Sequence, residues 1–239
     1  MEIKIKYKMN SFLEIYQEFK KIDNIEDIAY ERLFENYIKL NLKNDDKIVD
    51  IESTNQEKIV LKISPAIPGM IYTFINLNKE NVKILEDIKK GKLIKFHDFV
   101  PILFCTSYDD KKNIIKGLNL NMLPNFERLK FLEAFYQAFK PFFEKIEETI
   151  YNNKPALNEK FIQLSLNKKN SDIFKKFNKI YNEKFDFAYR SYNLKNLINY
   201  RMIEYEEWRY IPFFNPKNSF KKINFDKIYE AYKNIKYIK

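Results

Sequence analysis

Apolar residues recur at helical spacing near the start of the chain. Ser11 can cap a helix, because its side chain can accept a hydrogen bond from a first-turn backbone N–H group. Two apolar stripes follow, formed by Phe12, Leu13, Tyr16 and Phe19, and, after Asn24, by Ile28, Leu33, Tyr37 and Leu40. We therefore predict two amphipathic helices before residue 58, preceded by a short strand or arm over residues 2–7.

The pattern changes to short β-like runs in the next part of the chain. Runs over residues 58–63, 70–74, 99–106 and 114–122 are separated by turn residues such as Pro68 and Gly69. Pro101 lacks a backbone donor, which favours a sheet edge or the first position of a ladder. In the last run, apolar residues alternate with Asn119 and Asn121, which predicts one buried face and one solvent-facing face. A helix over residues 81–90, ended by Gly91, interrupts these strands.

Helical spacing returns after Pro124. The longest stripe extends from Phe126 to Phe139, and Pro141 predicts a kink or a restart after it. Further helices are predicted over residues 171–181, 193–208 and 224–235, with a loop over residues 212–216.

The whole pattern predicts an α+β fold. A small, mostly antiparallel sheet or SH3-like barrel spans about residues 58–122, amphipathic helices flank it, and the C-terminal half is mainly helical. The expected units are an N-terminal arm with helices (1–57), a β-rich block (58–123) and a helical region (124–239) that packs as one unit.

Two of the three glycines bracket the β-rich block, and glycine often marks a backbone conformation that other residues adopt only with strain. Three short segments stand out there: Pro68-Gly69-x-x-Tyr72-x-Phe74, then Asp98-x-x-Pro101, then Gly117-Leu-Asn119-Leu-x-x-Leu123-Pro124 with Arg128 shortly after. Gly117 opens an alternating strand, which predicts a positive φ, a bulge or a close backbone approach.

This three-part pattern resembles one in virion proteins of crAss-like tailed bacteriophages, with His97 where that pattern has a tyrosine. DNA end-protector proteins of tailed phages are also similar to it. The resemblance covers about residues 65–135, and its closing segment is the most specific part. It implies a structural protein of the virion, made in the host bacterial cytoplasm, whose partners are portal, neck or tail-ring proteins and further copies of itself. It implies no catalytic residue.

The net charge of +10 suggests nucleic-acid binding, because clustered cations release condensed counterions from phosphate groups. Only five residues are arginines, however, and the abundance of Lys, Asn, Ile, Tyr and Phe is typical of an AT-rich genome. The candidate phosphate contacts are Lys168, Lys169, Lys175 and Lys176. Their interleaving with Phe174, Phe177 and Tyr181 could bind DNA without reading its sequence, but a helix with a core-facing aromatic stripe accounts for it more simply.

Few residues offer catalytic chemistry. His97 beside Asp98 could form a base with its orienting group, and Cys105 is the lone thiol, but neither lies in a nucleophile motif. Asp109-Asp110 and Glu204 to Glu207 could hold a cation, although a turn and a helix face account for them more simply. Three glycines exclude a phosphate-binding loop of the Walker or dinucleotide type. We expect no enzyme, no cofactor and no metal.

A lone cysteine fits a reducing compartment, and no run of the sequence is long and apolar enough for a secretion signal or a membrane span. We expect a soluble chain with no membrane contact. The aromatic segment formed by Trp208, Tyr210, Pro212, Phe213 and Phe214 is the candidate interface, because Trp and Tyr are enriched in binding hot spots.

The sequence therefore favours a non-enzymatic neck or tail ring subunit that assembles into a cyclic oligomer around the DNA channel of a tailed phage. A DNA terminus-binding (end-protector) protein is the first alternative. A small phage enzyme is the second.

Overall fold

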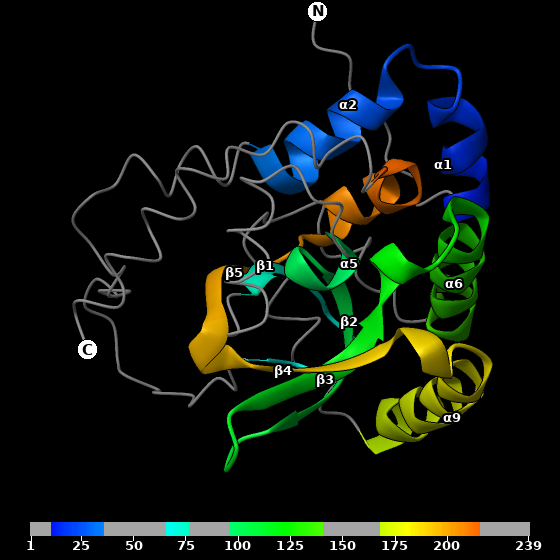
Figure 1. The fold of residues 1–239 in the computed structure, drawn as a ribbon. Helices are drawn as coiled ribbons and strands as arrows, with labels where there is room; N and C mark the ends of the chain where they lie inside the picture. The colour runs from blue at the N-terminus through cyan, green and yellow to red at the C-terminus, as the bar shows by residue number, and fades with distance from the viewer. Residues whose placement is uncertain (1–10, 36–65, 77–95, 141–167, 216–239) are drawn as a thin grey trace, which may run out of the picture.

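A computed structural model describes residues 11–35, 66–76, 96–140 and 168–215 (Figure 1). The described residues form an α+β fold around a five-stranded antiparallel sheet, so the predicted fold class is confirmed. The elements predicted at 2–7, 58–63, 81–90 and 224–235, and the kink at Pro141, lie outside the described residues.

The described chain consists of α-helices, β-strands and short 3-10 and π-helical segments. The α-helices are α1 (Phe12–Phe19), α2 (Ile25–Tyr30), α5 (Phe96–Phe99), α6 (Asn125–Ala138) and α9 (Lys168–Lys184). The strands are β1 (Ile71–Asn76), β2 (Ile102–Asp109), β3 (Ile114–Asn119), β4 (Tyr189–Asn193) and β5 (Leu197–Met202). A π-helical turn η1 (Glu31–Glu35) and the 3-10 helices η2 (Leu120–Met122), η3 (Asp186–Ala188), η4 (Leu194–Asn196) and η5 (Tyr205–Phe213) complete the described chain.

The first two predicted helices are present as α1 and as α2 with η1, and the predicted positions Tyr37 and Leu40 lie outside the described residues. Ser11 caps α1 through a capping box, in which its hydroxyl accepts from the Glu14 N–H and the Glu14 carboxylate accepts from the Ser11 N–H. Phe12 is buried and packs edge-on against Tyr136 of α6. The hydrophobic stripe of α1 therefore attaches the N-terminal segment to α6.

The sheet has the strand order β4-β3-β2-β1-β5, and every neighbouring pair is antiparallel. No ladder joins β4 to β5, so the sheet is open and the alternative of a closed SH3-like barrel is wrong. The polar turn predicted after Tyr108 connects β2 to β3. Pro101 directly precedes β2 and so leaves the ladder intact.

The two faces of the sheet bury different partners. Phe104 of β2 faces α6 and α9, where it contacts Phe131, Phe135 and Phe177. On the opposite face, Phe74 of β1 packs against Tyr192 of β4 and Tyr200 of β5, with ring centroids 5.0 Å and 5.8 Å apart. Since β4 and β1 are separated by two strands, this contact requires a strongly curved sheet with Phe74 on its concave face.

The connection between the two edge strands supports the same curvature. Only the three residues of η4 separate β4 from β5, yet these strands lie at opposite edges of the sheet. A flat sheet of five strands would place its edges too far apart for so short a link. The sheet therefore bends until its edges approach each other without pairing.

The predicted helix over residues 193–208 is wrong, because this part of the chain holds η4, β5 and the start of η5. Tyr200 and Met202 alternate with Arg201, and in so short a run this period cannot be distinguished from helical spacing by sequence alone. Residues 197–202 form a strand because they pair with β1, where Met202 lies opposite Tyr72. The loop expected from residue 212 is also wrong in part, since Pro212 and Phe213 belong to η5. The C-terminal half of the described chain is nevertheless mainly helical, as predicted, because α6, α9 and the 3-10 helices hold more residues than β4 and β5.

Candidate functional site

The three segments of the sequence pattern come together on adjacent strands. The first segment precedes and forms β1, the second leads into β2, and the third spans the end of β3 and η2. The Gly69 N–H donates to the Cys105 carbonyl oxygen at 2.8 Å, and the Cys105 N–H donates to the Met70 carbonyl oxygen at 2.9 Å. The Tyr72 hydroxyl accepts from the Ile67 N–H at 2.8 Å, which holds the turn before β1. The pattern therefore describes one contiguous structural unit.

Both glycines of the pattern have a backbone reason. Gly69 has φ +92°, a conformation that residues with a side chain rarely adopt. Gly117 lies opposite Cys105, next to a bulge that inserts Thr106 into β2. A Cβ at position 117 would lie 2.0 Å from the Phe104 carbonyl oxygen, so the predicted bulge and close approach are confirmed.

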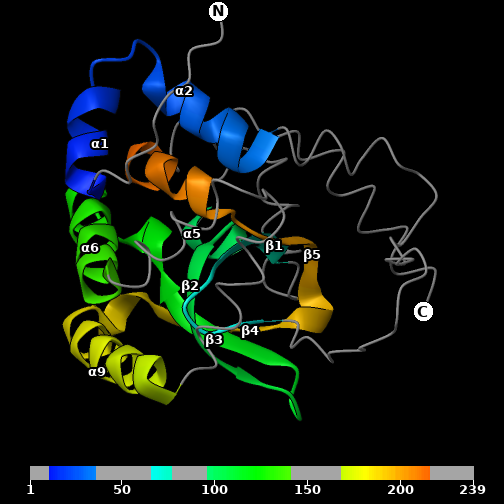
Figure 2. The same cartoon turned by 180° about the vertical axis from the view of Figure 1, so that it is seen from behind.

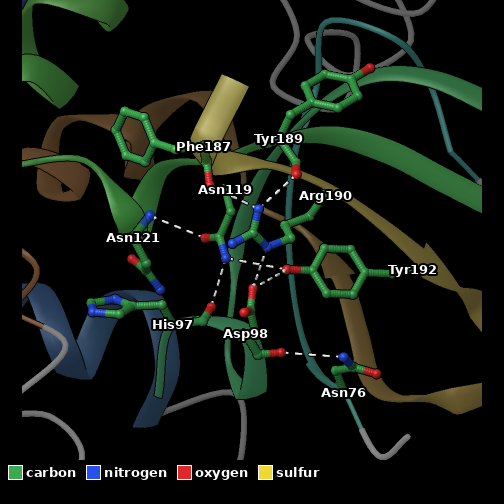
Figure 3. Close-up of polar contacts among 9 residues, drawn as sticks. All are labelled: Asn76, His97, Asp98, Asn119, Asn121, Phe187, Tyr189, Arg190 and Tyr192. Atoms are coloured by element: carbon green, nitrogen blue, oxygen red, sulfur yellow. Dashed lines mark hydrogen bonds and ion pairs between the residues drawn. The ribbon is translucent and has the colours of Figure 1, made fainter. Parts of the chain in front are cut away.

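Asn119 is the centre of a polar network at one end of the concave face (Figure 3). Its side-chain amide donates to the His97 carbonyl oxygen at 2.7 Å and to the Tyr192 hydroxyl at 3.2 Å. Its side-chain oxygen accepts from the Asn121 N–H, which caps η2. Asn119 is 0 % exposed and Asn121 is also buried, so the predicted solvent-facing asparagine face is wrong.

Asn119 and Asn121 are buried because their side chains form hydrogen bonds with backbone groups instead of with water. The Asn121 amide donates to the Val100 carbonyl oxygen at 2.7 Å, and Asn76 of β1 donates to the Asp98 carbonyl oxygen at 3.3 Å. The carbonyl groups of the short helix α5 and the residue after it are thereby satisfied by asparagine side chains. Asparagines thus anchor α5 to the sheet.

The Asp98 carboxylate accepts hydrogen bonds from two groups of β4. The Arg190 Nε donates to it at 3.0 Å and the Tyr192 hydroxyl at 3.4 Å. Burial, together with the negative charge of Asp98, raises the pKa of Tyr192, so this hydroxyl stays protonated at neutral pH. In Figure 3 the His97 ring points away from the Asp98 carboxylate. The arrangement therefore fixes β4 to α5 and does not present a base paired with its orienting carboxylate.

Arg128 has a different role at the other end of the pattern. It is buried, and its guanidinium donates to the carbonyl oxygens of Leu123, Ile211 and Phe214. Burial lowers the pKa of this group to about 10, which leaves it charged at neutral pH. Arg128 therefore joins the start of α6 to the end of η5.

The candidate catalytic groups are used for structure. Cys105 is buried, and burial raises the pKa of its thiol to about 12, so it is a poor nucleophile at neutral pH. The Glu207 carboxylate pairs with Arg201 at 2.7 Å and accepts from the Glu204 N–H at 2.9 Å. Among the described residues, no three His, Cys, Asp or Glu side chains form a group that could hold a metal ion.

The candidate interface is wrong, because the structure places it in the core. Trp208, Pro212, Phe213 and Phe214 are buried and Tyr210 is partly buried. The Trp208 indole donates to the Ile203 carbonyl oxygen at 3.0 Å and its ring lies 5.8 Å from Phe135. Aromatic enrichment is shared by cores and interfaces, so composition alone could not separate them.

The candidate phosphate contacts lie on α9. Lys175 and Lys176 are exposed, and Lys175 forms an ion pair with Asp172 at 3.8 Å. Lys168 and Lys169 lie in the first turn of the same helix, and their side chains lie outside the described residues. Phe177 is buried and Phe174 and Tyr181 are partly buried against the core, as the helical interpretation of this stretch predicts.

Several residues of the network were not found from the sequence. Asn76, Arg190 and Tyr192 carry no local motif, and their roles depend on β4 and β1 lying near α5. The Thr106 hydroxyl, which contacts the Tyr189 hydroxyl and donates to the Lys116 carbonyl oxygen, also has no signal in the sequence. Only the scarcity of arginine could have drawn attention to Arg190.

No protein-family model, curated protein or solved structure matches the chain. No helix among the described residues is long and apolar enough to cross a membrane.

Proposed function

We propose that the chain is a structural virion protein of a tailed phage, a neck or tail ring subunit that assembles into a cyclic oligomer. One observation supports this proposal above the others: the polar residues of the phage-like pattern hold backbone together. Asn119 and Arg128 donate to main-chain carbonyl groups, and Tyr72 accepts from a main-chain N–H. A pattern used in this way specifies a scaffold, which is what a subunit of a repeating assembly requires.

The ring would join this chain to further copies of itself and to portal, neck or tail-ring proteins around the DNA channel. Identical subunits close into a ring when each uses two different surfaces on its two neighbours. The chain's net charge of +10 supports contact with DNA passing through such a channel, without recognition of its sequence.

Native mass spectrometry of the purified chain, with negative-stain microscopy of the same sample, tests the proposal. We expect discrete oligomers of one stoichiometry with a central opening, and the chain in purified phage particles. A chain that is monomeric at every concentration and absent from particles would overturn the proposal.

The alternative of a DNA terminus-binding protein gains support from the exposed Lys175 and Lys176 on α9. Titrating linear and circular duplexes of equal length across salt concentrations separates the two functions. A channel subunit should bind both forms weakly and lose them as salt rises. Binding that prefers linear ends at physiological salt would favour the end protector.

A further inference from the structure

The large hydrophobic side chains that the described surface exposes fall into two groups. They are Leu13 (47 %) and Ile22 (42 %) near α1, and Phe126 (56 %), Ile180 (61 %) and Phe187 (58 %) near α6 and α9. Figures 1 and 2 place α1 and α2 at one end of the molecule and α9 at the other, with α6 between them. Single exposed apolar side chains are normal on a protein surface, so the charges around them decide whether these positions can bind a partner.

The end of the molecule that carries α9 combines exposed apolar side chains with positively charged ones. Glu127 binds Lys184 at 3.0 Å and Lys130 at 3.2 Å, and Lys130 lies over the ring of Phe126. These contacts bring the start of α6 to the end of α9. Helix α9 carries Lys168, Lys169, Lys175, Lys176, Lys179 and Lys184 against Asp172 and Glu183. Lys176 and Lys179 are exposed beside Ile180 and form no ion pair with a described residue.

Among the described residues, the opposite end carries more carboxylates than cations, although the chain as a whole is strongly basic. Its carboxylates are Glu14, Glu18, Asp23, Glu26, Asp27 and Glu31, and its cations are Lys20, Lys21 and Arg32. Glu18 and Asp23 are exposed near Ile22, as are Lys20 and Lys21, so the acidic excess of this end comes from Glu14, Glu26, Asp27 and Glu31 against Arg32. Each end thus presents exposed apolar side chains among charges, and the two ends differ in sign.

We propose that the α9 end of one copy docks against the α1–α2 end of the next copy, an inference that rests on the ring assembly proposed above. The lysines around Ile180 meet the carboxylates of the α1–α2 end, and the apolar side chains of both ends lose contact with water. Complementary charge across such a surface fixes orientation and suppresses like-with-like contact. Because the two surfaces differ, the contact is head-to-tail, which is the arrangement that can close into a ring.

Charge reversal at either end tests the contact. We expect K176E/K179E and, separately, E18K/D23K to raise the dissociation constant for self-association at least tenfold. At protein concentrations where the wild type is itself dissociated, the melting temperature should be unchanged, because all four side chains are exposed. K111E/K112E is the matched control: it makes the same charge change at the exposed turn between β2 and β3 and should assemble as the wild type does. Sedimentation velocity at several protein and salt concentrations measures all of these.

Mixing the two impaired variants gives the sharper result. In an equimolar mixture the unaltered end of each variant meets the unaltered end of the other, and the two reversed ends also complement each other. We therefore expect the mixture to recover oligomers that neither variant forms alone, in an alternating arrangement that native mass spectrometry identifies by mass. The variant that carries all four substitutions should also recover assembly.

The outcomes separate this contact from the ring itself. If the wild type forms discrete oligomers and the charge-reversed variants form them equally well, the contact is wrong and the ring proposal stands. If K176E/K179E assembles normally but loses salt-sensitive retention on DNA, the α9 surface binds nucleic acid and the contact is again wrong. If the wild type is monomeric and absent from particles, the proposed function fails and the contact fails with it.

Discussion

Gly117 of β3 lies so close to Phe104 of β2 that a Cβ at position 117 would be 2.0 Å from the Phe104 carbonyl oxygen. The contacted atom belongs to the backbone, so even alanine requires the β2–β3 ladder to shift. We expect Gly117→Ala to lower the free energy of unfolding by about 3 kcal/mol or more, measured by urea denaturation.

Gly69→Ala is the comparison for that variant. The nearest atom to a Cβ at position 69 belongs to the Phe174 side chain at 3.4 Å, so the loss comes from the left-handed backbone and should be about 1–2 kcal/mol. Equal losses at the two glycines would show that the close approach at Gly117 has no energetic effect.

Arg128 should be irreplaceable even by another cation. Arg128→Lys keeps the charge but offers one ammonium group where a planar guanidinium reaches three carbonyl groups, so we expect a loss of about 2–4 kcal/mol. Limited proteolysis should show that η5 becomes more accessible in this variant. Lys130→Met, at an exposed position on the same helix, should change stability by less than about 0.5 kcal/mol. An Arg128→Lys protein with wild-type stability would contradict this role.

Asn119→Asp tests the network on the concave face. A carboxylate oxygen in place of the amide nitrogen would face the His97 carbonyl oxygen, 2.7 Å away in the native protein, and could not donate to it. We expect a loss of about 3 kcal/mol at neutral pH that becomes smaller as pH falls and the carboxyl group is protonated. The same substitution at the exposed Asn125, in the first turn of α6, should be neutral or slightly stabilising. Urea denaturation at several pH values distinguishes the two sites.

The buried Cys105 thiol should make the free energy of unfolding depend on pH in the alkaline range. Burial raises the pKa of its thiol from 9.0 to about 12, and a group with a raised pKa stabilises the folded state below its unfolded pKa and loses that contribution as pH rises. We expect the free energy of unfolding to decline from pH 9.0 upward, with Cys105 contributing about 1 kcal/mol per pH unit. Tyr72 and Tyr192, whose pKa values burial also raises, add to the decline above pH 10.0.

The control for that prediction is Cys105→Ser. Serine does not titrate in this range. In the variant, the free energy of unfolding should therefore stay constant between pH 9.0 and pH 10.0 and decline only above pH 10.0, where the tyrosines titrate. Identical pH slopes in the two proteins would show that the thiol does not titrate differently in the folded and unfolded chains.

Local signals in the sequence were sufficient where a short segment determines its own structure. The capping box at Ser11 and Glu14 defines the start of α1, and the spacing of Phe174, Phe177 and Tyr181 identifies the buried side of α9. The close approach at Gly117 was predictable because a chain with only three glycines tends to keep one where its backbone leaves no room for a side chain.

The remaining features depend on distant partners. Asn119 and Asn121 are polar and alternate with leucines, and they are buried because α5 brings its carbonyl groups to them. Trp208 and its neighbours likewise become core only because α6 packs on them. Residues 197–202 become a strand because they pair with the edge of β1. No local pattern within these residues indicates that pairing.

The pairing of β1 with β5 also has a consequence for the order in which the chain can fold. Tyr72 pairs with Met202, so β1 keeps one unpaired edge until nearly all of the described chain has been synthesised. Contacts so distant in sequence form slowly, and an exposed strand edge can pair with another chain in the meantime. A nascent chain stopped before Leu197 should therefore aggregate rather than populate a smaller native fold, and folding in the cell should depend on chaperones that cover β1 during synthesis.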